Sequence, residues 1–106
     1  MYILFDQGTP APLRTFLVGH RVATAHECGW GQLENGDLLS TAEAAGFEVL
    51  VTTDKNLRYQ QNLSSRKIAV VVLGTTNWPR IRPAVQLVTE AVEKLAPGAF
   101  IELNIP

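Results

Sequence analysis

Residues 67–73 read Lys67-Ile68-Ala69-Val70-Val71-Val72-Leu73, a nearly continuous apolar run that is rich in β-branched side chains. Such a strand is favoured only where both of its faces are buried, as they are inside a parallel sheet whose two faces carry helices. Shorter runs of the same kind occur at residues 2–5 and 48–53. We therefore expect residues 67–73 to form a central or nearly central strand of a parallel sheet.

The remaining elements follow from the residues on either side of these runs. Further strands are expected at residues 21–25 and 100–103, the latter at an edge of the sheet, and helices at residues 13–18, 36–45, 55–62 and 81–95. Glycines after three of these helices, Gly19, Gly46 and Gly98, are typical helix ends. The alternation of strands and helices predicts an α/β fold, a three-layer α/β/α sandwich around a central, mostly parallel five-stranded sheet.

Composition limits the classes of function. A chain of 106 residues, 46% of them hydrophobic, is expected to form one domain over residues 1–106. Its formal net charge of -1 means that nucleic acid would have to bind to a local basic patch. The single cysteine, Cys28, excludes an internal disulfide and a multi-thiolate metal site, and it favours a reducing compartment. With no signal-like start and no stretch near ~20 apolar residues, we expect a cytoplasmic protein without membrane contact.

Three acids stand where a parallel sheet would bring them together. Asp6 follows the run at 2–5, Asp54 follows the run at 48–53, and Asp37 lies in the first turn of the helix expected at 36–45. Ligands of open parallel sheets gather at the carboxyl ends of the strands. Clustered carboxylates repel one another unless a cation intervenes, so they predict a hard divalent ion held by oxygen ligands. The alternative is that these acids cap helices and turns.

The segment after Thr53 offers the densest set of polar groups. Asp54 would complete the carboxylate ligands, and Asn56 could add a neutral oxygen ligand. Lys55 and Arg58 are cations that could bind a phosphate group of a substrate. The alternative is that Asp54 only caps the short helix that follows.

The loop after residues 67–73 should leave the sheet at the same edge as the acids. Thr75 and Thr76 are expected to contact substrate there, and Arg80 and Arg82 are expected to bind phosphate groups. Trp78 would offer a stacking surface for an unpaired base, which together with the arginines suits single-stranded RNA. The alternative is that Trp78 packs against the last helix while the arginines are solvated.

Three features of the sequence form one pattern: an apolar strand that ends in Asp6, an acid at the start of a helix, Asp37, and the motif Thr52-x-Asp54-x-Asn56-Leu57 after a strand. This pattern resembles the PIN-like domain family, in particular short bacterial proteins related to VapC-type toxins. The resemblance covers residues 1 to about 95. It implies a magnesium- or manganese-dependent ribonuclease in which Asp6, Asp37 and Asp54 are catalytic and bind the metal, with Asn56 at the place of a fourth acid.

The resemblance also implies partners. A protein of this family would cleave single-stranded RNA as the toxin of a toxin-antitoxin pair and bind an antitoxin-like protein. Apart from the resemblance, apolar residues on the first two expected helices suggest a homodimer. The short group usually reads Asp-Glu-Asn where this chain has Asp6-Gln7-Gly8, and it usually has an acid at the place of Asn56. The missing charges keep a second hypothesis open, a catalytically degenerate PIN-like binding module. A phosphoacceptor receiver domain is a third, although Gln7 and Asn104 replace the acid and the lysine that it expects.

Overall fold

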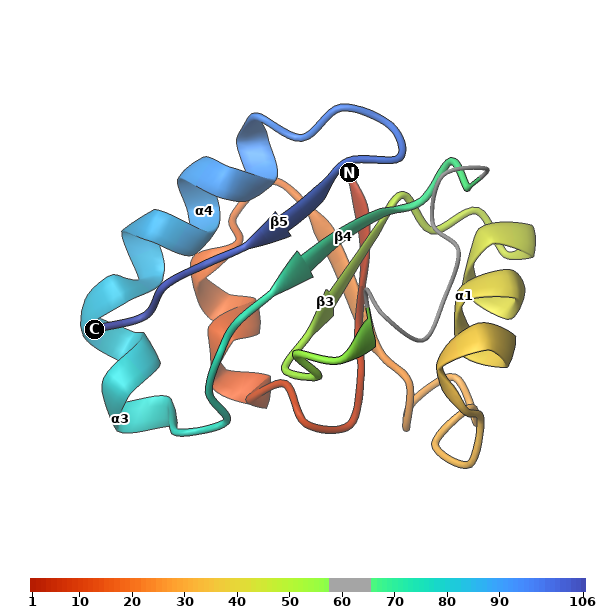
Figure 1. The fold of residues 1–106 in the computed structure, drawn as a ribbon, viewed down its shortest axis with the longest axis horizontal. Coiled ribbons are helices and arrows are strands. Elements are labelled where there is room, and N and C mark those ends of the chain that lie inside the picture. The colour runs from red at the N-terminus through yellow and green to blue at the C-terminus, as the bar shows by residue number, and fades with distance from the viewer. Residues whose placement is uncertain (58–65) are drawn as a thin grey trace.

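The computed structural model describes residues 1–57 and 66–106, and its core is a five-stranded sheet in which every pair of neighbouring strands is parallel (Figure 1). The strand order is β2-β1-β3-β4-β5. The strands are β1 (Tyr2–Phe5), β2 (Arg21–Thr24), β3 (Val49–Thr52), β4 (Ala69–Val72) and β5 (Phe100–Glu102). The predicted α/β class with a parallel five-stranded sheet is confirmed.

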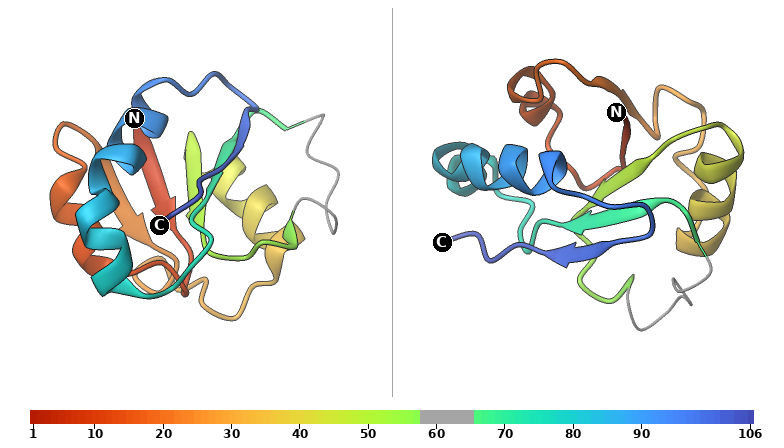
Figure 2. Two further views of the ribbon diagram at one scale, coloured as in Figure 1. Left: turned by 60° about the vertical axis from the view of Figure 1, so that its left-hand side comes forward. Right: turned by 90° about the horizontal axis from the view of Figure 1, so that it is seen from above.

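Helices lie on both faces of the sheet. In the described residues they are the 3-10 helices η1 (Ala11–Phe16) and η2 (Arg82–Ala84) and the α-helices α1 (Asn35–Ala44), α3 (Trp78–Ile81) and α4 (Val85–Glu93). Figure 2 shows α1 on one side of the sheet and η1, α3 and α4 on the other. This arrangement is compatible with the three predicted layers.

The residues of β3 and β4 explain why helices pack on both faces of the sheet. All four residues of β3 and of β4 are buried. Along β4 the side chains alternate, since Val71 packs in the core beneath α4 whereas Val70 and Val72 pack in the core beneath α1. Burial on both faces is what the apolar run at residues 67–73 predicts, and it is confirmed.

Two predicted helices differ from those observed. The expected helix at 81–95 is divided into α3, η2 and α4, because Pro83 has no N–H group to continue the backbone hydrogen bonds of an α-helix. The expected helix at 13–18 is a short 3-10 helix with Pro12 in its first turn. The expected helix at 55–62 extends into residues outside the described ranges. Within those ranges, no helix is long and apolar enough to cross a membrane.

Glu27 joins η1 to the turn that follows β2. Its backbone N–H donates to Thr24 Oγ1 at 3.0 Å, and the Thr24 N–H donates back to Glu27 Oε1 at 2.8 Å, a reciprocal capping arrangement. The Arg14 guanidinium donates to both carboxylate oxygens of Glu27. The hydrogen bond from Arg14, followed by that from Thr24, lowers the pKa of Glu27 from its ordinary value of 4.5 to about 2.

A Glu27→Gln variant is therefore expected to melt at a lower temperature than the wild type near neutral pH. A lowered folded-state pKa stabilises the fold above the unfolded value of 4.5, and this contribution is lost as the pH falls from 4.5 toward 2. Thermal melts at about pH 7 and about pH 3 should show the difference shrinking at the lower pH. Glu93→Gln, at an exposed position of α4, is the control. If wild type and Glu27→Gln differ in melting temperature by the same amount at both pH values, the stabilising role of the Glu27 carboxylate is refuted.

Candidate functional site

The strand order places a topological switch point between β1 and β3. The chain passes from β1 to β2 on one side of β1 and then returns to β3 on its other side. Open α/β sheets bind ligands at the carboxyl ends of the strands at such a point. Asp6 directly follows β1, and Asp54 lies two residues after the end of β3. The structure therefore places these two acids of the predicted site at one edge of the sheet.

The Asp6 carboxylate is fixed by two threonine hydroxyls. Thr9 Oγ1 lies 2.8 Å from Asp6 Oδ1, and the same hydroxyl lies 2.8 Å from the carbonyl oxygen of Val51. Thr52 Oγ1 donates to Asp6 Oδ2. Each carboxylate oxygen has a further lone pair beyond the one that accepts a hydroxyl proton. Asp6 is thus oriented by its neighbours and can still coordinate a cation.

Thr52 connects the two acids. Its side chain is only 1% exposed, and its hydroxyl accepts a hydrogen bond of 3.1 Å from the backbone N–H of Asp54 while donating to Asp6. Asp54 Oδ1 in turn accepts from the backbone N–H of Asn56 at 2.9 Å. Asp54 therefore also orders its own turn, as the capping alternative expects. One buried hydroxyl holds the residues of both acids in place.

The loops at this edge approach each other closely. A Cβ atom at Gly8 would lie 2.4 Å from Thr53 Oγ1, so a larger residue at position 8 would force Thr53 or one of the two loops after β1 and β3 to shift. A Cβ atom at Gly31 would lie 2.6 Å from Gln7 Nε2, which places the loop before α1 against the residue that follows Asp6. Gly8 and Gln7 thus both lie at contacts between these loops.

Asp37 is exposed in the first turn of α1, where the helix dipole favours a carboxylate. Figure 1 shows α1 beginning on the same side of the molecule as the carboxyl ends of β1 and β3. In residues 1–57 and 66–106, however, no three His, Cys, Asp or Glu side chains are placed to hold one metal ion together. The structure brings Asp6 and Asp54 to the sheet edge and leaves Asp37 outside any such group.

The oxygen donors at this edge fit a hard divalent cation in their chemistry. Mg²⁺ is commonly bound through one or two carboxylates, with water and substrate phosphate completing its ligands. Asp6 and Asp54 can supply those two carboxylates, and the oxygens of Asp6 are already oriented by threonine hydroxyls. Asn56 is exposed, and its backbone N–H is bound to Asp54. A third carboxylate from Asp37 stays a prediction.

The predicted substrate residues occupy different surroundings. Lys55 and Arg80 both line a cavity of about 410 Å³ at the carboxyl ends of β4 and β5. Arg80 Nε donates to the carbonyl oxygen of Pro106 at 3.3 Å, and its Nη2 donates to that of Ile105 at 3.2 Å. The Arg80 guanidinium therefore holds residues 105 and 106, a role that the sequence did not indicate.

Of the other residues that are predicted to contact substrate, those that the structure describes do not line this cavity. Thr75 Oγ1 accepts from the backbone N–H of Asn77 at 3.1 Å and so shapes its own turn, while Thr76 and Arg82 are exposed. Arg58 lies outside the described residues. Trp78 is half-buried at the margin of the core, with its ring 5.9 Å from that of Phe16. The packing alternative for Trp78 therefore has support from these contacts, and base stacking on the exposed part of the ring stays a prediction.

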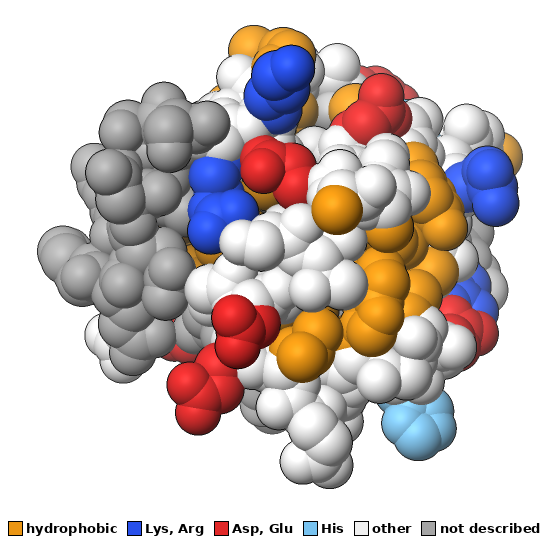
Figure 3. All heavy atoms as spheres, turned by 90° about the vertical axis from the view of Figure 1, so that its right-hand side faces the viewer, with side chains coloured by type: hydrophobic (Ala, Val, Ile, Leu, Met, Phe, Trp, Pro, Cys, Tyr) orange, Lys and Arg blue, Asp and Glu red, His pale blue; other side chains and the backbone are white. Residues whose placement is uncertain are grey.

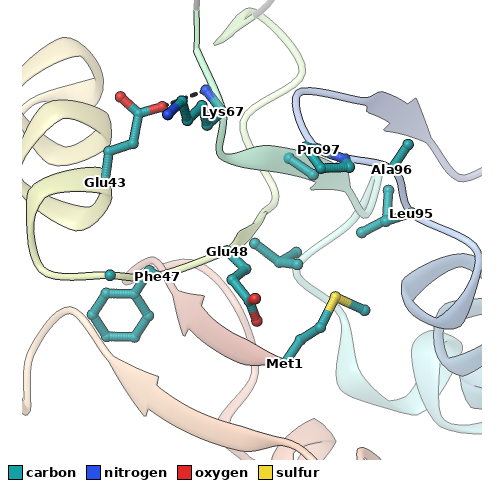
Figure 4. Close-up of a pocket in the computed structure, with 11 residues that line it drawn as sticks. Met1, Glu43, Phe47, Glu48, Lys67, Leu95, Ala96 and Pro97 are labelled. Carbon is teal, nitrogen blue, oxygen red and sulfur yellow. Dashed lines mark hydrogen bonds between the residues drawn. The ribbon is translucent and has the colours of Figure 1, made fainter.

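A second cavity, of about 350 Å³ and mostly apolar, lies at the opposite, amino-terminal edge of the sheet. Figure 4 shows Leu95, Ala96 and Pro97 facing Met1 and Glu48 across it. The two carboxylates that line it accept hydrogen bonds from the backbone. Glu48 Oε2 accepts from the N–H of Tyr2 at 2.8 Å, and Glu43 accepts from the N–H groups of residues 67 and 68. The cavity is separate from Asp6 and Asp54.

Hydrophobic side chains also gather on the face that carries α1 (Figure 3). Tyr2 stacks on Phe47 with ring centroids 3.8 Å apart, and Trp30 meets Phe47 edge-on at 5.8 Å. Cys28 is half-buried beside this aromatic group, and burial raises the pKa of its thiol. Cys28 therefore behaves as a small apolar residue.

Comparison of the chain with protein-family models, with curated proteins and with solved structures finds no match.

Proposed function

We propose that this protein is a Mg²⁺- or Mn²⁺-dependent ribonuclease that cleaves single-stranded RNA at the carboxyl ends of β1 and β3. Asp6 and Asp54 bind the metal ion in this proposal, and Asp37 approaches from the start of α1 as the third catalytic acid. The observation that supports it most is the Asp6 carboxylate, held by the hydroxyls of Thr9 and Thr52 at the switch point of a parallel sheet. A carboxylate oriented in this way is suited to bind a cation.

Each residue has a distinct role in this proposal. A bound Mg²⁺ or Mn²⁺ would polarise a phosphodiester oxygen and lower the pKa of a coordinated water. Thr52 and Thr9 are positioning residues, because they orient Asp6 without touching the substrate. Lys55, next to Asp54 in the chain, supplies positive charge for the RNA backbone.

The resemblance to PIN-like domains extends the proposal to the biological role. We infer a cytoplasmic toxin that an antitoxin-like protein restrains, and we infer a homodimer from the apolar residues of the first two helices. Co-purification of the chain with the product of a neighbouring small gene, with loss of RNA cleavage in the complex, would support this role.

The alternative function is a catalytically degenerate PIN-like module that acts by binding a protein partner. The observation that favours it is that, in the part of the chain that the structure describes, no three acids are placed to hold one metal ion. The apolar cavity at the amino-terminal edge would give such a module a surface for a partner. A module of this kind would bind its partner equally well with and without divalent metal.

The experiment that separates the two functions is an RNA cleavage assay with the purified chain. The nuclease hypothesis expects cleavage of an unstructured RNA in Mn²⁺ or Mg²⁺ and none after a chelator is added, whereas double-stranded RNA is left intact. Absence of cleavage in both metals by folded protein would favour the binding module.

Asn56→Asp is expected to tighten Mn²⁺ binding and to increase cleavage. The added carboxylate restores negative charge beside Asp54, at some cost in the stability of the metal-free protein because like charges repel. The gain in affinity should be about tenfold, a difference of about 1.4 kcal/mol. Calorimetry and thermal melts measure both effects. If affinity, cleavage rate and melting temperature all stay unchanged, Asn56 has no part in the site.

A further inference from the structure

We propose that the cavity at the carboxyl ends of β4 and β5 binds a phosphate group of the RNA strand, beside the proposed metal site. This inference rests on the proposed nuclease function and adds the place where the substrate backbone is held. We call this cavity the phosphate pocket. Its lining residues are Lys55, Val72, Gly74, Arg80, Glu102, Leu103, Asn104 and Ile105.

The phosphate pocket has the size and the polarity that a phosphate needs. Its volume of about 410 Å³ exceeds that of a single phosphate and admits the attached ribose as well. Its walls are mostly polar, in contrast to the cavity at the amino-terminal edge. Two cationic side chains, Lys55 and Arg80, and one anionic side chain, Glu102, line it.

The two cations are held differently. Arg80 is fixed by its hydrogen bonds to the carbonyl oxygens of Ile105 and Pro106, which use its Nε and one N–H of Nη2. The guanidinium carries five N–H donors, so donors beyond these two can bind an anion. Lys55 is exposed, and its flexible stem lets the ammonium move to meet a phosphate.

Lys55 links the phosphate pocket to the proposed metal site. It stands between Asp54 and Asn56 in the turn after β3, and it also lines the pocket. A Cβ atom at Gly74 would lie 3.6 Å from Lys55 Cε, so the lysine stem passes across the backbone after β4. An RNA strand that places one phosphate at Asp6 and Asp54 would thus meet Lys55 at the adjoining pocket.

The test is a titration with adenosine 5′-monophosphate, followed by NMR chemical shifts at low salt with a chelator present. We expect shifts at Gly74, Leu103 and Asn104 that adenosine without phosphate does not cause. Lys55→Gln should weaken binding at least about tenfold, because a hydrogen bond between charged groups is lost. Glu102→Gln should tighten it, because the pocket loses its negative charge. Lys94→Gln, at the exposed end of α4, is the matched control and should change nothing.

The inference is overturned if adenosine binds as tightly as its monophosphate, or if Lys55→Gln and Lys94→Gln have the same effect. Since the chelator removes divalent metal, this titration does not depend on the metal site. Cleavage by a protein whose phosphate pocket binds nothing would refute the pocket and leave the nuclease function standing. A pocket that binds phosphate in a protein without metal-dependent cleavage would refute the nuclease function alone.

Discussion

Asp6→Asn is expected to lower metal-dependent RNA cleavage by at least about 100-fold, since loss of a metal ligand should exceed the effect of losing an outer hydrogen-bond partner. Asparagine keeps the size of the side chain but has no charge and only one acceptor oxygen. The effect should appear in the cleavage rate at a Mn²⁺ concentration that saturates the wild type. Asp54→Asn is expected to behave in the same way, because the two residues share the sheet edge.

The same substitution should have a modest effect on stability. Asp6 accepts hydrogen bonds from Thr9 and Thr52, and replacing a charged acceptor by a neutral one should cost about 1–2 kcal/mol. The variant is therefore expected to remain folded, which a melt can verify. Glu93→Gln removes a carboxylate from α4 and is the control for charge alone. Equal cleavage by wild type and Asp6→Asn at matched concentrations of folded protein would refute the catalytic role of Asp6.

Thr52→Val is expected to reduce both stability and metal affinity. Valine has the shape of threonine without the hydroxyl, so the Asp6 carboxylate loses a donor and the Asp54 N–H loses its acceptor in a partly buried setting. Leaving such groups unpaired should cost about 1–3 kcal/mol of unfolding free energy. Mn²⁺ affinity should fall about 10–100-fold, as for other outer-sphere partners of metal ligands. Denaturant melts and calorimetry measure the two effects.

Thr52→Ser provides the matched comparison, because it keeps the hydroxyl and removes only a methyl group. It should retain most of the metal affinity. A merely structural Thr52 would let both variants bind Mn²⁺ like the wild type once they are folded, and that outcome would contradict its role in positioning Asp6.

The sheet could be predicted from the sequence because each strand has a local signal. The apolar run at residues 67–73 requires burial on both faces, and Val70 and Val71 indeed pack into opposite cores. Asp6 and Asp54 could be placed at one sheet edge for the same reason, since parallel strands end together. The breaks around Pro83 were harder to predict, because the apolar spacing continues past the proline.

The parts of the site that the sequence did not indicate depend on contacts between distant residues. The hydrogen bond from Thr52 to Asp6 joins the ends of β3 and β1, and no local pattern marks it. A threonine at the end of an apolar strand was a usable signal, because a buried hydroxyl needs a partner. Arg80 was predicted as a phosphate ligand from its charge alone, yet much of its role is to hold Ile105 and Pro106.

A calorimetric titration of the purified wild-type chain with Mn²⁺, beside the same titration of Asp6→Asn, tests the proposed metal site most directly. We expect a saturable binding isotherm for the wild type and no binding above dilution heat for the variant. Identical isotherms for the two folded proteins, or no heat from either, would contradict a metal site at the β1/β3 edge.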